Sequence, residues 1–269
     1  MQFQKIKLKR HSKELRKPWH QYKVLILIGF WQERFKEQAK WTKETREFIF
    51  KKIKLEKNAK ILDVGCGTGE ISLEIARNYD AEIFGIDIDP KMVSACRKIF
   101  HKNKLLGKFE IADAMKLPFN DNFFDMTFCN FLLLWVQSPF DVIQEMARVT
   151  ISGGYVLALA EPDYGGKIDY PEFGLRELIS ESLVEAGANP EVGRMLGACF
   201  KDASLEFELG IESIPWDNET CKKAFEQEWW FLEKVTNNWE EIKRKEKEFI
   251  EKGIRFSFNP VFYAIGKKS

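Results

Sequence analysis

A run of glycines between an apolar segment and a helical one is the part of this sequence best suited to chemistry. It reads Ile-Leu-Asp-Val-Gly-Cys-Gly-Thr-Gly-Glu, so that Gly65, Gly67 and Gly69 follow Asp63 at alternate positions. Glycine permits a sharp turn and lets a ligand approach the backbone more closely than a Cβ atom allows. The segment therefore predicts a ligand-binding loop between a strand and a helix.

A dinucleotide is the first ligand to consider for this loop. The nicotinamide-binding pattern G-x-G-x-x-G requires a glycine at position 70, where this chain has Glu70. A carboxylate at the start of the helix would repel a pyrophosphate, which binds at helix N-termini. The loop is therefore predicted to bind a ligand without phosphates.

Three further motifs follow in order along the chain. Gly-Ile-Asp-Ile-Asp-Pro contains Asp87, 18 residues beyond Gly69, and Ala-Asp-Ala-Met-Lys-Leu-Pro-Phe contains Asp113. Phe-Asp-Met-Thr-Phe-Cys-Asn then ends at Asn130. From about residue 59 to 163, with a weaker tail to 266, the sequence resembles the class I S-adenosyl-L-methionine (SAM) dependent methyltransferases.

The resemblance implies that SAM is the cofactor. Asp63 and the loop backbone would hold its amino-acid end, and Asp87 would accept both ribose hydroxyls, since a carboxylate offers several lone pairs. Ile88 and Met92 would border the adenine, Asp113 would receive the adenine amino group, and Ala114 would offer a backbone N–H. The residues implied in cofactor binding are Asp63, Gly65, Cys66, Gly67, Gly69, Asp87, Ile88, Met92, Asp113, Ala114 and Asn130.

Several of these residues also have a structural interpretation, which the sequence leaves open. The glycines could form a tight turn, Asp87 or Asp113 could cap a helix, and Asn130 could bond a strand end. Glu145 and Arg148, three apart, are interpreted as a structural surface pair on a helix. The cysteines of these motifs, Cys66 and Cys129, are interpreted as small packing residues.

The methyl acceptor is less well defined. Methyl transfer from a sulfonium needs mainly alignment and desolvation, so no general base is assigned. The Asn-Pro-Pro-aromatic signature of amino-methylating enzymes is missing after Asn130. The substrate candidates are Tyr22, Trp135, Glu161, Asp163, Tyr164, Trp229 and Trp230. For the tryptophans, a lid over the site and simple helical packing or dimer contact are the two alternatives.

The elements that must position these residues alternate between strand and helix. Such alternation predicts an α/β fold with a mostly parallel, seven-stranded Rossmann-like sheet and helices on both faces. Strands are expected at residues 60–64, 82–86, 109–112, 124–129, 154–160, 204–214 and 256–266. Helices are expected at residues 18–40, 42–53 (with Thr42 as N-cap), 70–78, 90–101, 139–148, 171–186, 190–201 and within 218–252.

The expected organisation has three parts. Residues 1–57 form an N-terminal helical extension or lid, and residues 58–163 form the SAM-binding core. Residues 164–269 complete the sheet and carry a helical substrate-lid insertion at about 218–252. The predicted function is methyl transfer to a small or medium-sized acceptor in a partly apolar pocket.

Charge distribution supports an alternative. Residues 1–60 hold 18 Lys/Arg and 6 Asp/Glu, whereas the rest of the chain holds 24 and 35, so that the net charge of +1 hides +12 against −11. A basic arm can recruit RNA or an acidic protein, and its basic residues are Lys5, Lys7, Lys9, Arg10, Lys13, Arg16 and Lys17. A second alternative is a non-catalytic SAM-binding protein, which would have no acceptor cavity.

The compartment is expected to be the cytoplasm. The N-terminus is charged where a signal peptide needs an apolar stretch, and the longest apolar run, residues 24–31, is too short for a membrane span. The five cysteines are expected to stay reduced, and their spacing predicts no metal site. We expect a monomer or homodimer with no membrane partner.

Overall fold

The computed structural model describes residues 28–212 and 215–269. Its central seven-stranded sheet has the order β3-β2-β1-β4-β5-β9-β7. The strands are β1 (Ala59–Val64), β2 (Ala81–Asp87), β3 (Lys108–Ile111), β4 (Phe124–Cys129), β5 (Thr150–Pro162), β7 (Glu206–Glu212) and β9 (Val261–Lys267). Strands β1 to β5 run parallel, and β9 is antiparallel to both of its neighbours. The predicted α/β fold is confirmed.

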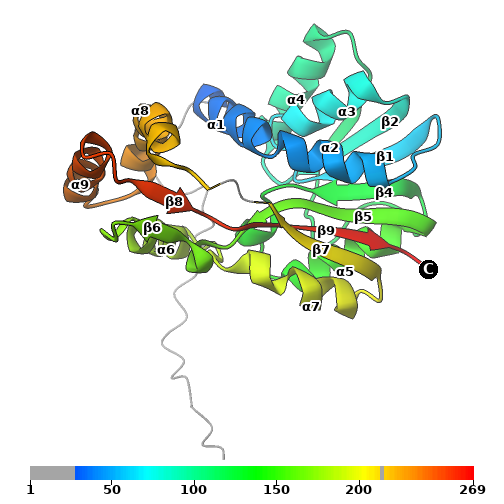
Figure 1. Cartoon of the computed structure of the whole chain (residues 1–269). Helices are drawn as coiled ribbons and strands as arrows, with labels where there is room; N and C mark the ends of the chain where they lie inside the picture. The colour runs from blue at the N-terminus through cyan, green and yellow to red at the C-terminus, as the bar shows by residue number, and fades with distance from the viewer. Residues whose placement is uncertain (1–27, 213–214) are drawn as a thin grey trace, which may run out of the picture.

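Helices cover both faces of this sheet, as Figure 1 shows. One face carries α2 (Lys43–Lys52), α3 (Glu70–Asn78) and α4 (Pro90–Lys102), with α1 (Ile28–Trp41) beside them. The other face carries α5 (Pro139–Val149) and α7 (Leu196–Asp202). Ile61 and Leu62 are adjacent in β1, fully buried, and belong to the hydrophobic clusters on opposite faces. This alternation is what a strand covered on both sides requires.

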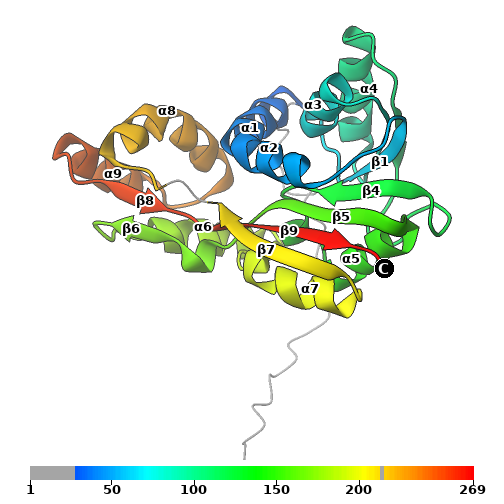
Figure 2. The ribbon, with the colours of Figure 1, turned by 45° about the vertical axis from the view of Figure 1, so that its right-hand side comes forward.

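A second unit lies beyond the carboxyl ends of the parallel strands (Figure 2). It contains α6 (Leu175–Glu185), α8 (Asn218–Val235), α9 (Glu240–Glu251) and a small antiparallel pair of β6 (Ile168–Tyr170) and β8 (Phe256–Phe258). Its own hydrophobic cluster includes Phe173, Phe225, Trp229 and Ile250. The helical insertion between the last two strands of the central sheet was predicted, but the β6–β8 pair was not.

Buried charges join this unit together. Arg255 donates to Glu246 at 2.8 Å and to Asp169 at 2.7 Å, and Lys167 donates to Asp169 at 2.9 Å. All four side chains are at most 10% exposed. Buried ions are tolerated when they are paired in this way, so the cluster fixes α9 and β8 against β6.

Several predicted boundaries were wrong for local reasons. The expected strand 256–266 is two strands, because Pro260 lacks the N–H that a continuous ladder would need. The expected helix 171–186 starts only at Leu175, after Gly174 in a left-handed conformation with φ +93°. Thr42 precedes α2 but does not cap it, since its hydroxyl donates to the Gln38 carbonyl at 3.0 Å. Of the helix expected at 18–40, only the part from residue 28 lies among the described residues.

Candidate active site

The glycine loop follows β1 and is held against β2. The amides of Gly65 and Cys66 both donate to the carbonyl of Ile86 at 2.8 Å. Gly67 has a φ of +50°, and a Cβ atom there would lie 3.0 Å from the ring of Phe35 in α1. Glycine is therefore needed where α1 approaches the loop.

Asp87 lies at the end of β2, across from the same loop. Its Oδ2 accepts a hydrogen bond of 2.9 Å from the Gly67 amide, and its Oδ1 accepts one of 2.9 Å from the Asp89 amide. Burial raises the pKa of this carboxyl group, and the backbone donors oppose that rise. Each oxygen has a second lone pair, so the carboxylate can still accept hydrogen bonds from two hydroxyls.

Asp63 provides a second carboxyl group at this edge of the sheet. It is 3% exposed, and Ser72 Oγ donates to its Oδ2 at 2.6 Å. Burial raises the pKa of Asp63 to about 7, the Ser72 bond opposes this rise, and the charge of Asp87 adds to it. A ligand cation beside Asp63 would favour its charged form.

The loop after β3 presents Asp113 and Ala114. Asp113 is exposed, and its Oδ1 accepts a 2.9 Å hydrogen bond from the Met115 amide, so the side chain shapes its own loop. Ala114 is buried at 7% exposure. One carboxylate oxygen of Asp113 therefore already has a partner within its own loop, and the other oxygen remains for a ligand.

Glu145 and Arg148 hold this loop from α5. The two side chains pair at 2.7 Å, as expected from their spacing. Arg148 also donates to the carbonyls of Leu117 and Phe119 at 3.0 and 2.8 Å, and Glu145 accepts from the Leu117 amide at 2.7 Å. The predicted structural pair is thus also a clamp on the backbone of the loop after β3.

A cavity of about 1720 Å³ connects these groups with the second unit. Ten of the eleven residues implied in cofactor binding line it. Gly69 is the exception: it directly precedes α3 with a φ of +86°, and a Cβ atom there would collide with Cys96 Sγ. Its role is therefore the turn into the helix.

Helix α1 and the insertion form the far walls of the cavity. From α1 the lining residues include Trp31, Arg34, Phe35, Gln38 and Trp41, which recur at helical spacing on one face. From the second unit they include Trp216, Phe225, Glu228 and Phe231. The sequence predicted aromatic residues of the insertion and an N-terminal helical lid here, but it did not single out Phe35 and Trp41 of α1. The spacing of three and four among the lining residues of α1 was the available signal.

Comparisons with known proteins place the chain in a family. A family model described as a methyltransferase domain matches residues 62–158. The demethylmenaquinone methyltransferase of Bacillus licheniformis is 32% identical over 195 residues, which are 67% of this chain and 80% of that protein. This chain is a class I SAM-dependent methyltransferase.

Two further matches illustrate how widely the sequence and the fold are shared. An uncharacterized methyltransferase of Schizosaccharomyces pombe is 30% identical over 183 residues, 62% of this chain and 66% of that protein, so the chain spans just under two thirds of its length. Phosphoethanolamine N-methyltransferase 2 of Haemonchus contortus, solved with phosphomonomethylethanolamine and S-adenosylhomocysteine, has a TM-score of 0.59 at 15% identity. That likeness covers 86% of this chain and 56% of the other, and it shows the shared fold.

The residues of the methyltransferase fit SAM at the glycine-loop end of the cavity. SAM carries positive charge on its sulfonium and its ammonium group, and Asp63 and Asp87 provide carboxyl groups there. Within the part of the chain that is described, Thr68 Oγ1 and Asn130 Oδ1 are buried and have no hydrogen-bond partner. Both residues line the cavity, so a polar ligand can satisfy them.

The residues proposed from sequence to contact substrate fall into two groups. Trp135 and Tyr164 line the cavity, whereas Glu161 and Asp163 are not among the described residues that do. Glu161 is fully buried and accepts hydrogen bonds of 3.0 Å from the amides of Leu132 and Leu133. Asp163 accepts two hydrogen bonds from Arg194, at 2.6 and 2.7 Å. Both carboxylates hold loops at the strand ends, and this corrects their assignment as substrate contacts.

The assignment of the two tryptophans of the insertion as substrate contacts is also corrected. Trp229 is fully buried in the cluster of the second unit, and its Nε1 donates to Glu246 at 2.7 Å. Trp230 is 43% exposed, and the Lys234 ammonium lies 4.3 Å from the centre of its ring. Neither is among the described residues that line the cavity, whereas Glu228 and Phe231, which flank them in α8, are.

Some sequence expectations concern residues that the structure does not describe, and others can be compared with it. Tyr22 and the basic residues from Lys5 to Lys17 lie outside the described residues. Among the residues that the structure describes, no helix is long and apolar enough to cross a membrane. The cavity expected of an enzyme, and not of a merely SAM-binding protein, is present.

Proposed function

We propose that this methyltransferase transfers the methyl group of SAM to a small or medium-sized acceptor held at the insertion end of the cavity. The acceptor would have a partly apolar body. The observation that carries this proposal is the cavity itself, which continues from the glycine loop to aromatic residues of α1 and α8.

The size of the cavity supports two ligands. Pockets for a single drug-sized molecule occupy about 300 to 1,000 Å³. The cavity of this chain, at about 1720 Å³, leaves room for an acceptor beside the cofactor. Trp41, Trp216, Phe225 and Phe231 would contact the apolar part of that acceptor.

Bound SAM supplies an electrophilic methyl group, whose transfer leaves S-adenosylhomocysteine. The protein would orient the reactants: Asp87 accepts hydrogen bonds from the ribose, and Asp63 pairs with the ammonium group. The Glu145–Arg148 clamp holds the loop that carries Asp113. Closure of α1 over the glycine loop excludes water, which aids alignment of the acceptor atom for displacement.

The experiment that tests this function uses full-length protein and SAM labelled in the methyl group. Cell extract is separated into small-molecule, protein and RNA pools before the reaction. We expect label in the small-molecule pool, and Asp87→Ala protein as the matched control should give little transfer at the same SAM concentration. Label confined to RNA or protein would reject the proposal and favour recruitment by the basic arm.

We also propose the cytoplasm as the compartment of this enzyme. All five cysteines are buried and unpaired in the described fold, which suits a reducing environment.

A further inference from the structure

The two ends of the cavity differ in charge. At the glycine-loop end, Asp63, Glu70 and Asp87 contribute carboxyl groups. At the insertion end, the charged side chains that line the cavity and are not exposed all have partners of opposite charge. Arg34 pairs with Glu228 at 2.8 Å. The buried cluster around Asp169 holds Lys167, Arg255 and Glu246. The other charged lining residues of the described chain away from the cofactor motifs are exposed: Lys40, Glu44, Lys91, Glu185 and Lys234. The insertion end therefore has no net buried charge to offer a ligand.

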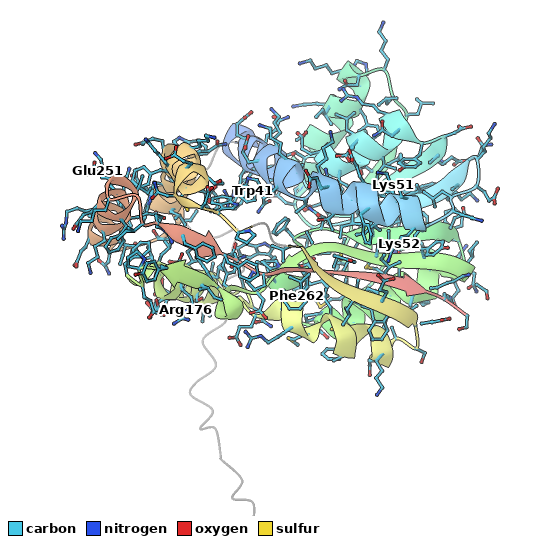
Figure 3. The ribbon with its side chains drawn as sticks, viewed as in Figure 1. Trp41, Lys51, Lys52, Arg176, Glu251 and Phe262 are labelled. Atoms are coloured by element: carbon cyan, nitrogen blue, oxygen red, sulfur yellow. The ribbon has the colours of Figure 1, made fainter. Side chains whose placement is uncertain are left out.

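Arg34 is the most constrained of these paired groups. Its guanidinium lies 4.6 Å from the ring centre of Trp41 and 4.3 Å from that of Phe231. The side chain is 9% exposed, and its Nε is buried with no hydrogen-bond partner among the described residues. Trp41 is the last residue of α1 (Figure 3). Two rings and Glu228 thus fix a guanidinium whose Nε–H is left to donate.

Tyr164 is the second donor on this wall. It lies just after β5, where its amide donates to the Pro190 carbonyl at 2.8 Å, and Asp163 beside it is held by Arg194. Tyr164, Arg34 and Glu228 all line the cavity. Burial raises the pKa of Tyr164 further above its ordinary value of 10. The hydroxyl stays protonated at neutral pH and has no hydrogen-bond partner in the described part of the chain.

Resting on the function proposed above, we propose that Arg34, Glu228 and Tyr164 form the acceptor-recognition set of this enzyme. The acceptor they select is an uncharged molecule with an apolar, ring-sized body and a carbonyl or hydroxyl oxygen. Arg34 Nε and the Tyr164 hydroxyl donate hydrogen bonds to that oxygen, and the aromatic walls hold the body.

The charge balance decides against an ionic acceptor. Glu228 already neutralises Arg34, so an anion would meet an adjacent carboxylate and a cation would meet an adjacent guanidinium. A charge brought into this space loses its hydration without gaining a partner, whereas a neutral oxygen gains donors that are otherwise unsatisfied. The set also lies on α1, the η3 turn (Tyr164–Gly166) and α8, so it forms only when these elements pack together.

Binding of four matched naphthalene derivatives to full-length protein saturated with S-adenosylhomocysteine tests the proposal. The probes are 2-naphthol, 2-methylnaphthalene, 2-naphthoate and 2-naphthylmethylamine, measured by calorimetry at pH 7. We expect 2-naphthol to bind about 2- to 10-fold more tightly than 2-methylnaphthalene for each hydrogen bond gained. Both charged probes should bind about 10-fold or more weakly than 2-naphthol, because a buried charge needs a free partner.

Two variants remove the donors singly. Arg34→Lys keeps the charge and a partner for Glu228 but loses Nε–H, and Tyr164→Phe loses only the hydroxyl. Each should reduce the preference for 2-naphthol over 2-methylnaphthalene by about 2- to 10-fold, with the affinity for S-adenosylhomocysteine within about twofold of wild type. Arg176→Lys, on the exposed side of α6, is the matched control and should change neither.

Four results would overturn the proposal. The first is that 2-naphthoate or 2-naphthylmethylamine binds most tightly of the four probes, and the second is that both variants keep the full preference for 2-naphthol over 2-methylnaphthalene. The third is that Arg34→Lys loses its affinity for S-adenosylhomocysteine, and the fourth is that no probe binds up to its solubility limit. The extract experiment separates these from failure of the proposed function, since label in the small-molecule pool would keep that function while the acceptor class was rejected.

Discussion

The amide of Gly67 donates to Asp87 Oδ2 at 2.9 Å, which ties the glycine loop after β1 to the carboxylate at the end of β2. Two motifs separated by 20 residues in the chain are thus one structural unit. A ligand that contacts either motif meets a loop that is already ordered, so binding carries little further entropic cost of ordering it.

Replacing Asp87 by Ala should therefore weaken SAM binding strongly. Two hydrogen bonds to a charged acceptor contribute roughly 3 to 6 kcal/mol gross, less what water replaces, and the loop also loses its anchor. Calorimetry with SAM measures the change, and Asp80→Asn, at an exposed position, is the control. Affinity within threefold of wild type would show that Asp87 is not the ribose ligand.

The pKa of Asp63, raised to about 7, predicts how stability depends on pH in the absence of ligand. The folded protein then holds a proton on Asp63 that the unfolded chain releases near its ordinary pKa of 3.8. Stability should fall as pH rises from about 4 to 7 and level off above, by an amount on the order of 1 to 4 kcal/mol.

Urea unfolding at pH 5, 6, 7 and 8 measures this effect as the difference between wild type and Asp63→Asn, which has no titratable group there. SAM should reverse the trend, because its ammonium group favours the charged carboxylate, so SAM affinity should rise between pH 6 and 7.5 in wild type alone. A pH slope shared by wild type and Asp63→Asn would contradict the assignment.

Glu161 should matter for stability and not for acceptor binding. In Glu161→Gln, the side-chain amide presents a donor toward the Leu132 or Leu133 amide, so one buried N–H loses its acceptor. Leaving such a group unsatisfied costs about 1 to 3 kcal/mol. Chemical denaturation gives the loss, and an acceptor KM raised without a loss of stability would restore Glu161 as a substrate contact.

Replacement by Ala should lower stability strongly at Trp229 and hardly at all at Trp230. Trp229 is fully buried, so Trp229→Ala should cost about 3 to 5 kcal/mol, whereas Trp230→Ala on the exposed side should stay within about 0.5 kcal/mol. Thermal unfolding of both variants compares them directly. Methyl transfer lost in Trp230→Ala at normal stability would instead support the lid function considered from the sequence.

A larger share of the residues assigned to the cofactor from the sequence line the cavity than of those assigned to the acceptor. Gly67 and Asp87 belong to segments whose geometry is set locally, by a strand end and a turn, so their types and spacing carry the information. In the sequence, Glu161 is an acidic residue at the end of a strand, which is also where a ligand-binding carboxylate would stand. Only the tertiary fold shows that the amides after β4 already satisfy it.

The acceptor wall illustrates the same difference. Arg34 and Glu228 are 194 residues apart, and no local pattern indicates that α1 meets α8. The aromatic content of the insertion was visible, but which tryptophan faces the cavity depends on the rotation of α8 against its cluster. Strand boundaries were predicted closely in the parallel core and less well at residues 256–266, where a single proline divides two sheets.

The cavity wall that α1 and α8 form together has a consequence for attempts to change the acceptor by exchanging segments between related enzymes. Half of it, Trp31, Arg34 and Trp41, belongs to α1, and the other half, Phe225, Glu228 and Phe231, belongs to α8. A transplanted insertion would bring only one half and would leave Arg34 facing a foreign helix. The exchangeable module of this enzyme is therefore discontinuous: α1 and α8 must be moved as a pair, and both must fit the turn that carries Tyr164.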